Sequence, residues 1–331
     1  MKALVTGGGG FLGSVIVRQL LAKGAEVAVL GRQRYPELER LGIRLCRGDI
    51  RDRDFVRQAA QGVDTVFHVA AKAGIWGSRE EFAAINVIGT ENVVRTCLEN
   101  GVATLVYTST PSVVFSHGDL AGVDERIPYA RRYLCHYAAT KAVAEEMVLA
   151  ADCGNLRTCA IRPHLIWGPG DPHLIPRLLD RGRRGQLKQV GDGRNLVDIT
   201  YVDNAAEAHL LAAANLKTIA SAAGRAYFIS QGEPVNLWDW INELFRRVGI
   251  PPVRQQVGFR TAYLAGALLE GMYHLLGRAE EPRMSRFLAE QLASSHWFSM
   301  ARAANELGYA PRVSTAEGMD RLIAWLRRMN H

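Results

Sequence analysis

Short apolar runs alternate with helix-like segments through the first half of the chain. The apolar runs occupy residues 3–6, 26–30, 44–46, 65–69, 105–108 and 158–161. In the stretches between them, apolar residues recur every three to four positions, as they do on one face of a helix. This alternation is typical of a parallel sheet that is covered by helices on both faces.

The alternation stops after residue 162. Residues 163–203 are rich in Pro, Gly and Arg, whereas 204–216 again shows a helical pattern and 226–230 is another apolar run. From about residue 234 the pattern is mainly helical. We therefore predict an α/β fold with a doubly wound parallel sheet (Rossmann) and a smaller, mainly helical, discontinuous substrate-binding domain. The sheet forms the dinucleotide-binding domain, which comprises 1–165 with 200–232 returning to it. The substrate-binding domain comprises 166–199 and 233–331.

The composition is that of a globular protein with a basic balance. Lys and Arg number 40 against 33 Asp and Glu, which gives a formal net charge of +7 over 331 residues. Such a balance can indicate nucleic acid, an anionic surface or an anionic cofactor. The chain has no basic helix with interleaved aromatic residues and no zinc-finger spacing, so we predict no nucleic-acid partner and no metal site.

The cysteines and the start of the chain indicate a cellular compartment. The five cysteines include no C-x-x-C pair, and their odd number favours free thiols in a reducing environment. A core-like strand at 3–5 leaves no room for a cleavable signal sequence. We expect a cytoplasmic protein.

The most apolar later segment is 261–277. It is interrupted by Glu270 and His274 and is short for a bilayer span. Two interpretations follow, a buried lid or an amphipathic helix that makes peripheral membrane contact.

A glycine-rich turn follows the first predicted strand directly. Gly7, Gly10 and Gly13 form G-x-x-G-x-x-G, with Phe11 and Leu12 between the last two, and a helical pattern continues over 14–23. Glycines let the backbone approach a pyrophosphate closely, and the helix N-terminus presents free N–H groups to it. Strand, turn and helix in this order predict a dinucleotide site.

The end of the second strand bears on the choice of cofactor. An acidic residue about 20 positions beyond the glycines would bind the ribose 2′-hydroxyl of NAD. Here the sequence is Leu30-Gly31-Arg32, and Arg32, helped by Arg34, offers a cation for a 2′-phosphate. We predict NADPH, with NADH possible because an arginine that stacks on adenine suits either cofactor.

Further cofactor contacts are expected at the ends of the third and fourth strands. Asp49 can accept from the adenine amino group or cap its own loop, and small residues after the fourth strand leave space for the cofactor. The predicted contacts are Asp49, Ile50, Ala70, Ala71 and Lys72.

The candidate catalytic pair is Tyr137 and Lys141. Their i, i+4 spacing near the start of a helical pattern places both on one helix face. A nearby ammonium lowers the pKa of a phenol from its usual ~10 and can hold the nicotinamide ribose. Tyr137 then serves as a general acid or base.

The fifth strand ends in several hydroxyl residues. Ligands of open α/β sheets bind at such carboxyl ends. We predict that Thr108 contacts the cofactor and that Thr110, with Ser109 as the alternative, polarises the substrate carbonyl. Asn86, in the preceding helical stretch, is either structural or part of a proton relay.

Together these motifs resemble the extended short-chain dehydrogenases/reductases. The glycine turn, Asp49, Y-x-x-x-K and the later RP…WGPG sequence at 162–170 carry the resemblance. The sequences at 106–113, 72–77 and 287–292 resemble the 3β-hydroxysteroid dehydrogenase branch. The resemblance implies that Pro163 and Ile166 contact the nicotinamide end. The family often has Ser where this chain has Thr110.

More narrowly, the chain resembles bacterial enzymes of long-chain olefin biosynthesis that reduce a β-keto acid (a 2-alkyl-3-oxoalkanoate) with NADPH. The resemblance implies an apolar small-molecule substrate and a homodimer formed through 80–100 and 137–151. Three alternatives stay open: a 3β-hydroxysteroid or 4-carboxysterol dehydrogenase, a nucleotide-sugar epimerase or dehydratase, and a non-catalytic dinucleotide-sensing regulator.

Overall fold

A seven-stranded parallel sheet forms the centre of the computed structural model, which describes residues 1–329. Its strand order is β12-β7-β5-β4-β1-β2-β3, and every pair of neighbours is parallel. The strands are β1 (Lys2–Thr6), β2 (Glu26–Gly31), β3 (Arg44–Arg47), β4 (Thr65–His68), β5 (Thr104–Thr108), β7 (Arg157–Pro163) and β12 (Arg225–Ile229). These match the seven apolar runs, so the predicted fold class is confirmed.

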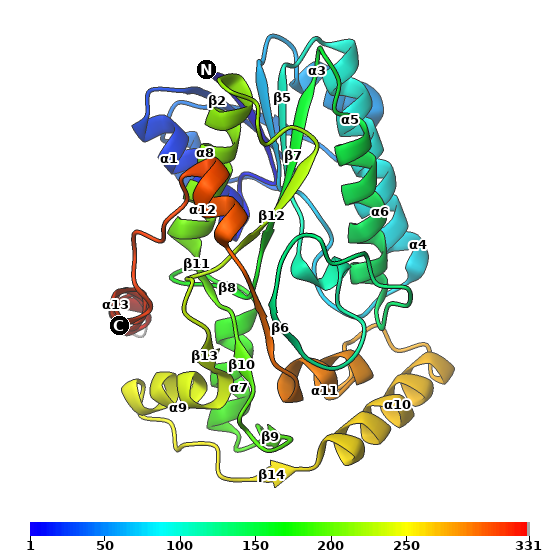
Figure 1. The fold of residues 1–331 in the computed structure, drawn as a ribbon, viewed down its shortest axis with the longest axis vertical. Helices are drawn as coiled ribbons and strands as arrows, with labels where there is room; N and C mark the ends of the chain where they lie inside the picture. The colour runs from blue at the N-terminus through cyan, green and yellow to red at the C-terminus, as the bar shows by residue number, and fades with distance from the viewer. Residues whose placement is uncertain (330–331) are drawn as a thin grey trace.

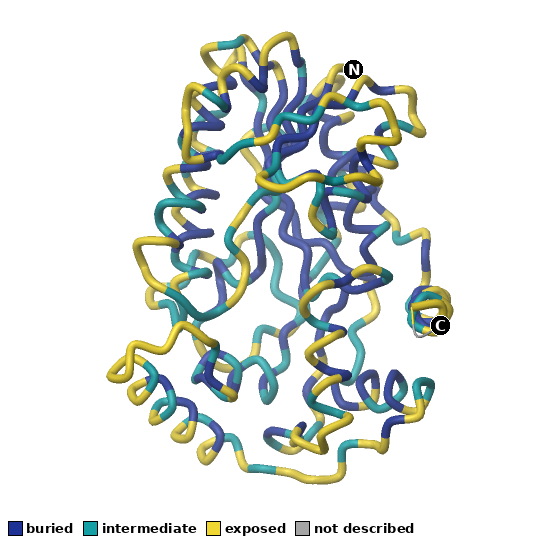
Figure 2. Tube along the Cα trace, turned by 180° about the vertical axis from the view of Figure 1, so that it is seen from behind, coloured by how far each residue is buried: buried dark blue, intermediate teal, exposed yellow. Residues whose placement is uncertain are grey.

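Helices cover both faces of the sheet (Figure 1). On one face lie α1 (Phe11–Ala22), α8 (Val202–Lys217) and α12 (Ala301–Leu307), and on the other lie α3 (Arg53–Ala59), α5 (Gly89–Glu99) and α6 (His136–Ala150). Each face has its own apolar core, one around Val5 and Ile16 and one around Leu4 and Val148. The strands are accordingly the most continuously buried part of the trace (Figure 2). Burial on both faces explains why their sequences are apolar without alternation.

The lower part of the molecule is mainly helical and has a separate core (Figure 1). That core includes Trp167, Trp240 and Phe245. A small sheet of order β13-β10-β15-β6 crosses this part, which the helical pattern did not predict. The elements here are β6 (Leu120–Val123), β8 (Ile166–Trp167), α7 (Leu174–Arg183), β9 (Gln189–Val190), β10 (Leu196–Val197), β11 (Thr200–Tyr201), β13 (Val235–Asn236), α9 (Leu237–Arg247), β14 (Gln256–Val257), α10 (Phe259–Leu275), α11 (Arg286–Ala293), β15 (His296–Phe298) and α13 (Thr315–Met329).

The last part of the chain returns to the sheet. Ala303, Leu307 and Tyr309 belong to the same core as α1 and α8, and the Tyr309 hydroxyl donates to the Ser230 carbonyl at 2.9 Å.

The remaining short elements connect the main ones. They are α2 (Pro36–Glu39), α4 (Arg79–Phe82), the π-helix η1 (Ala83–Ile88) and the 3₁₀-helix η2 (Pro111–Val113).

The strand order locates the site. β1 pairs with β2 on one side and β4 on the other, so the direction of the connections reverses at β1. Ligands of open α/β sheets bind in the crevice at this switch point, beyond the carboxyl ends of the strands.

Two further observations concern cysteines and membranes. All five cysteines are free thiols, as their spacing predicted. Within residues 1–329, none of the helices combines the length and apolarity needed to traverse a bilayer.

Candidate active site

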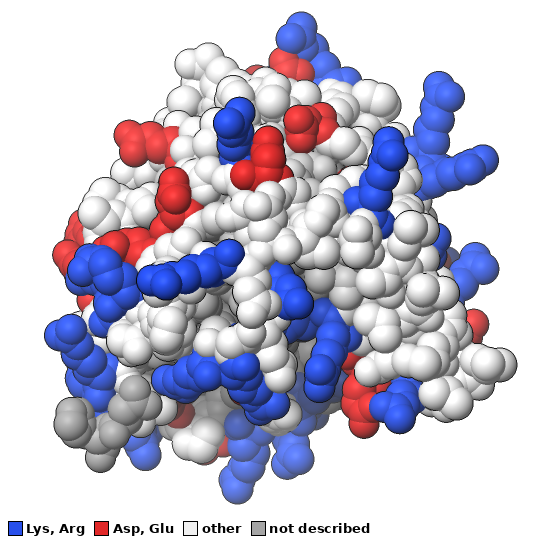
Figure 3. All heavy atoms as spheres, turned by 90° about the horizontal axis from the view of Figure 1, so that it is seen from below, with Lys and Arg blue, Asp and Glu red and all other residues white. Residues whose placement is uncertain are grey.

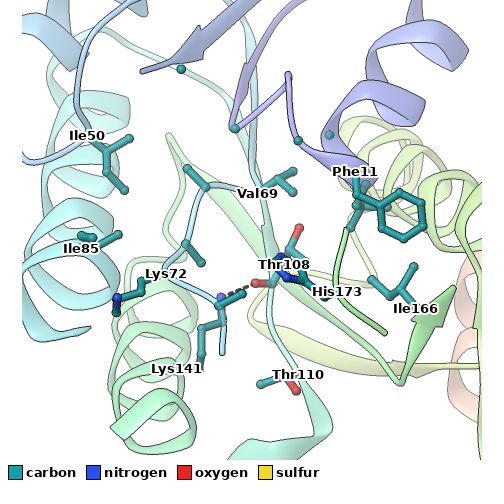
Figure 4. A pocket seen from close by; sticks show the side chains of 18 of the residues that line it. Phe11, Ile50, Val69, Lys72, Ile85, Thr108, Thr110, Lys141, Ile166 and His173 are labelled. Atoms are coloured by element: carbon teal, nitrogen blue, oxygen red, sulfur yellow. Dashed lines mark hydrogen bonds between the residues drawn. The ribbon is translucent and has the colours of Figure 1, made fainter. Parts of the chain in front are cut away.

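A cavity of about 520 Å³ lies at the carboxyl ends of the strands. It brings together the predicted catalytic residues and the predicted cofactor contacts, with the exception of Arg34. They are Gly7, Gly10, Phe11, Leu12, Gly13, Arg32, Asp49, Ile50, Ala70, Ala71, Lys72, Thr108, Thr110, Tyr137, Lys141, Pro163 and Ile166. Figure 4 shows Phe11 and Ile166 on one wall, Ile50 and Ile85 on the other, and Lys141 and Thr110 between them.

The glycine turn is closely packed and leaves the start of α1 open. Gly7 has φ +70°, and a Cβ atom there would lie 2.9 Å from the Ala70 backbone. A Cβ atom on Gly13 would lie 2.2 Å from the Gly7 carbonyl oxygen. No side chain caps the N-terminus of α1, and its first turn contains no acidic residue. The turn therefore fits the pyrophosphate of a dinucleotide.

The second strand leads to Arg32 and to Tyr35, a residue that the sequence patterns did not indicate. Both line the cavity. The Tyr35 ring packs so closely on Gly31 and Gly9 that a Cβ atom on either would clash with it. Tyr35 thus forms an aromatic wall of the cavity beside Arg32, the residue predicted to bind a 2′-phosphate. The only sequence signal for it is an aromatic residue shortly after the second strand.

Two charged residues near this end are engaged with neighbours. The Asp49 carboxylate accepts from Nε and Nη2 of Arg51, at 3.0 and 2.8 Å, and from the Arg51 backbone N–H at 2.9 Å. These bonds keep the pKa of Asp49 below its usual value. Asp49 therefore caps its own loop while lining the cavity. Arg34 does not line the cavity, and its Nε lies 3.7 Å from Glu39.

Tyr137 is the second residue of α6 and lines the same cavity as Thr110. Desolvation raises the pKa of Tyr137 to about 12, whereas the hydrogen bond with the Thr110 side chain acts in the opposite direction. The Thr110 hydroxyl also accepts from the Ser112 backbone N–H at 3.2 Å. A phenol with this pKa is protonated at neutral pH, which suits a proton donor.

Lys141 is buried, and its ammonium group points away from solvent. Its Nζ donates to the Thr108 carbonyl at 2.5 Å and lies 4.0 Å from the centre of the Tyr107 ring. Burial lowers the pKa of Lys141 to about 7, while the charge of Glu145, one turn further along α6, raises it. The sequence predicted that Lys141 would lower the pKa of Tyr137. In this structure the side chain with that effect is Thr110.

Thr108 connects the lysine to the opposite face of the sheet. Its hydroxyl lies 2.8 Å from Nε2 of His209, and Nδ1 of His209 lies 2.7 Å from the Ala205 carbonyl. Because a carbonyl only accepts, Nδ1 carries the proton and the Thr108 hydroxyl donates to Nε2. The Thr108 hydroxyl is therefore hydrogen-bonded to His209, and the Thr108 backbone carbonyl fixes Lys141 (Figure 4).

Ser109 and Asn86 differ in their surroundings. Ser109 lines the cavity, whereas its hydroxyl oxygen is buried and has no hydrogen-bond partner among residues 1–329. Asn86 lies in the π-helix η1 and does not line the cavity. Its amide accepts from the Lys72 backbone N–H at 2.7 Å and donates to the Thr140 hydroxyl at 3.1 Å. Asn86 thus joins the loop after β4 to α6. Of the two roles that the sequence left open for Asn86, these bonds fit the structural one.

The opposite wall of the cavity follows β7. Pro163 and Ile166 line it together with Leu165, whose φ of +40° is unusual for a residue with a branched side chain. Strained backbone of this kind is concentrated at functional sites. His173, at the start of α7, also lines the cavity, as Figure 4 shows, and no sequence motif indicated it.

The sheet, the glycine cradle and the Tyr137/Lys141 pair define an extended short-chain dehydrogenase/reductase. The chain belongs, more narrowly, to the 3-beta hydroxysteroid dehydrogenase/isomerase family, whose model matches residues 4–257. It is an oxidoreductase acting on a CH–OH/C=O pair, as predicted.

Individual relatives extend over the whole chain. A 2-alkyl-3-oxoalkanoate reductase from Stenotrophomonas maltophilia (strain K279a) is 50% identical, and the match covers 98% of this chain and 99% of the relative. The mouse (Mus musculus) sterol-4-alpha-carboxylate 3-dehydrogenase (decarboxylating) is 34% identical, with 97% and 90% covered. Among solved structures, MoeE5 in complex with UDP-glucose and NAD superimposes with a TM-score of 0.77 at 26% identity, covering all of both chains.

Proposed function

We propose that the protein is an NADPH-dependent reductase that converts the ketone of a 2-alkyl-3-oxoalkanoate, a β-keto acid, to the β-hydroxy acid. The observation that carries this proposal is that Tyr137, Lys141 and Thr110 line the same cavity as the glycine cradle. The substrate class comes from the relative that is 50% identical over nearly the full length of both chains.

The protein's own groups supply the acid and the orientation. When bound, the nicotinamide supplies the hydride for the ketone carbon. Tyr137 donates the proton to the oxygen, and its pKa of about 12 keeps that proton in place at neutral pH. Thr110 and Tyr137 together hold the carbonyl oxygen, where negative charge develops.

Lys141 and Ser109 complete the site on this proposal. Lys141, fixed by the Thr108 carbonyl, holds the ribose hydroxyls of the bound cofactor. Ser109 lines the cavity, and its buried hydroxyl has no hydrogen-bond partner among residues 1–329, so we propose that it turns toward a bound molecule. An unsatisfied buried hydroxyl is costly, so a ligand that pairs with it gains binding energy.

We infer a preference for NADPH from the region around Arg32. The cavity there presents a guanidinium group and an aromatic ring from Tyr35. Asp49, the carboxylate that the sequence indicated at this end of the cavity, is already paired with Arg51. A 2′-phosphate therefore meets a free cation rather than a free acid.

Side-by-side turnover tests the substrate class. Purified protein is supplied with a 2-alkyl-3-oxoalkanoate and NADPH, and separately with a 4α-carboxysterol and NAD⁺. The proposal predicts that kcat/KM for the keto acid is at least about tenfold higher. Preferential oxidation of the sterol would instead establish the alternative suggested by the 34% identical relative.

The remaining alternatives have weaker support. The structure of MoeE5 with UDP-glucose and NAD shares the fold at only 26% identity. The Tyr137/Lys141 pair is in place, which argues against a non-catalytic regulator.

The other partners that we propose are a second copy of the chain and a membrane surface that α10 contacts. α5, α6 and the adjoining η1 expose the apolar residues Ile88, Leu98 and Val143, with exposed fractions of 47%, 49% and 46%. These helices lie in the segments expected to form the homodimer, and two copies packed there would cover these side chains. Light scattering on Val143→Glu tests this, since a dimer should become a monomer.

A further inference from the structure

α10 exposes a row of large apolar side chains, whereas Phe259 and Tyr263 at its start pack against the core of the lower part of the molecule. Its inner face, against α11, consists of Ala262, Gly266 and Glu270 at i, i+4 and i+8, and these residues are buried. Its outer face consists of large apolar residues, which would normally face the core. Their exposed fractions are 63% for Leu264, 76% for Leu268, 47% for Met272, 86% for Leu275 and 59% for Leu276.

These residues form a continuous stripe, which we call the α10 stripe. Positions 264, 268, 272 and 275 follow one another at helical spacing, and 276 closes the end of the helix. Single exposed leucines are normal, but a contiguous patch of this kind marks an interaction surface. The outer side of α10 is correspondingly exposed in Figure 2.

The inner side of α10 is held firmly to the protein. Glu270 accepts from the backbone N–H and from Nε of Arg286, each at 2.7 Å. The indole N–H of Trp76 donates to the Arg278 carbonyl at 3.1 Å, just beyond the helix. Because these contacts hold the C-terminal half of α10 against the protein, the stripe there is presented outward.

Arginines border the α10 stripe. Arg260 precedes it, Arg278 and Arg283 follow it, and all three are exposed with no ion pair among residues 1–329. Glu280 is an exposed acid in the same region, whereas Glu281 is paired with Arg177 at 2.7 Å. Seen from below in Figure 3, Lys and Arg dominate the charged groups of this end of the molecule.

We propose that the α10 stripe docks onto an anionic lipid surface, with the leucines in the acyl boundary and the flanking arginines at the headgroups. The inference rests on the proposed function only for the role of docking, which is access to a lipophilic substrate. The observations that support docking are independent of the substrate. Apolar burial combined with attraction to anionic lipids is the established physics of interfacial helices. The proposed dimer uses α5 and α6, which leaves the α10 stripe without a partner in the protein.

Docking would place lipid next to the candidate active site. Glu270 and His274 of α10 line a second cavity, of about 270 Å³, together with Ile75, Trp76 and Phe287. His136 and Ala139, which flank Tyr137 in α6, line the same cavity. Lipid at the α10 stripe would therefore be separated by the width of α10 from a cavity that residues around Tyr137 also line.

Vesicle co-sedimentation tests the proposal independently of turnover. The full chain is mixed with phosphatidylcholine vesicles with or without phosphatidylglycerol. We expect binding to the anionic vesicles that weakens in high salt and with phosphatidylcholine alone. The double variant Leu268→Glu/Leu275→Glu should reduce the partition coefficient at least about tenfold. Ile219→Glu, at a 73% exposed isoleucine outside α10, is the matched control and should bind like the wild type.

Three results would overturn the proposal. The first is no binding of the wild type to either vesicle, and the second is equal binding of wild type and double variant. The third is a lower oligomeric mass of the double variant by light scattering without vesicles, because the α10 stripe would then be a protein interface. Since none of these measurements uses catalysis, the reductase proposal can fail or succeed separately.

Discussion

The ammonium nitrogen of Lys141 donates a 2.5 Å hydrogen bond to the carbonyl oxygen of Thr108. This bond joins α6 to the end of β5 beneath the candidate active site. It also fixes a cation in a buried place. Desolvation disfavours the charged form there, and the charge of Glu145 opposes this effect by raising the pKa. The consequence is a lysine whose pKa is about 7.

Lys141 should make the cofactor-free protein more stable as the pH rises above 7. Its pKa is lowered from 10.5 to about 7 in the folded protein, so between these values the unfolded chain binds the proton and the folded chain does not. The unfolding free energy then rises with pH, by up to about 1.4 kcal/mol per unit. Below pH 7 both states are protonated and this dependence disappears. Urea unfolding from pH 6 to 9 measures the slope.

Lys141→Met provides the control for this dependence. Without the titrating group, the rise between pH 7 and 9 should be shallower than in the wild type. Identical slopes for the two proteins would show that the lysine titrates outside this window.

Arg32→Ser should weaken the use of NADPH more than that of NADH. Arg32 lines the cavity, and a lost charge-assisted contact with a phosphate corresponds to about a tenfold higher KM for NADPH. Arg34→Ser is the matched control, because Arg34 is paired with Glu39 outside the cavity. Steady-state kinetics with both cofactors decide the matter. Equal losses for NADPH and NADH would indicate that Arg32 contacts adenine instead.

Gly13→Ala should impair cofactor binding. The added Cβ atom would lie 2.2 Å from the Gly7 carbonyl oxygen, so the turn must open. We expect at least about a tenfold loss of dinucleotide affinity in fluorescence titration. Gly154→Ala, where a Cβ atom meets nothing within 4 Å, should bind like the wild type. Unchanged affinity in Gly13→Ala would place the pyrophosphate elsewhere.

Much of this architecture could be predicted because its signals are local. A buried parallel strand is a short apolar run, and the glycine turn and the Tyr137/Lys141 pair are defined by spacing along a few residues. The topology then brings these separate motifs to one edge of the sheet. Fold class and the composition of the cavity follow from such signals.

Features that depend on contacts distant in sequence could not be predicted. β15 pairs with β6 across more than 170 residues, and no local sequence pattern marks either short strand. Tyr35 and His173 reach the cavity from loops whose course depends on the rest of the fold. The apolar pattern of α10 indicated a helix, but which face is covered depends on how α11 packs against it.

The pKa of Tyr137 illustrates the same limit. Spacing alone suggested that Lys141 lowers it, whereas desolvation has the larger effect and Thr110 supplies the opposing hydrogen bond. Desolvation depends on everything that surrounds the phenol, and no short motif encodes it.

The most direct test of the central claim is NADPH oxidation by Tyr137→Phe with a 2-alkyl-3-oxoalkanoate. Removing the hydroxyl removes the proton donor and leaves the ring in place, so kcat should fall at least about 100-fold. The Kd for NADPH should stay within about twofold of the wild type. Turnover within about tenfold of the wild-type rate would contradict the assignment of Tyr137 as the general acid.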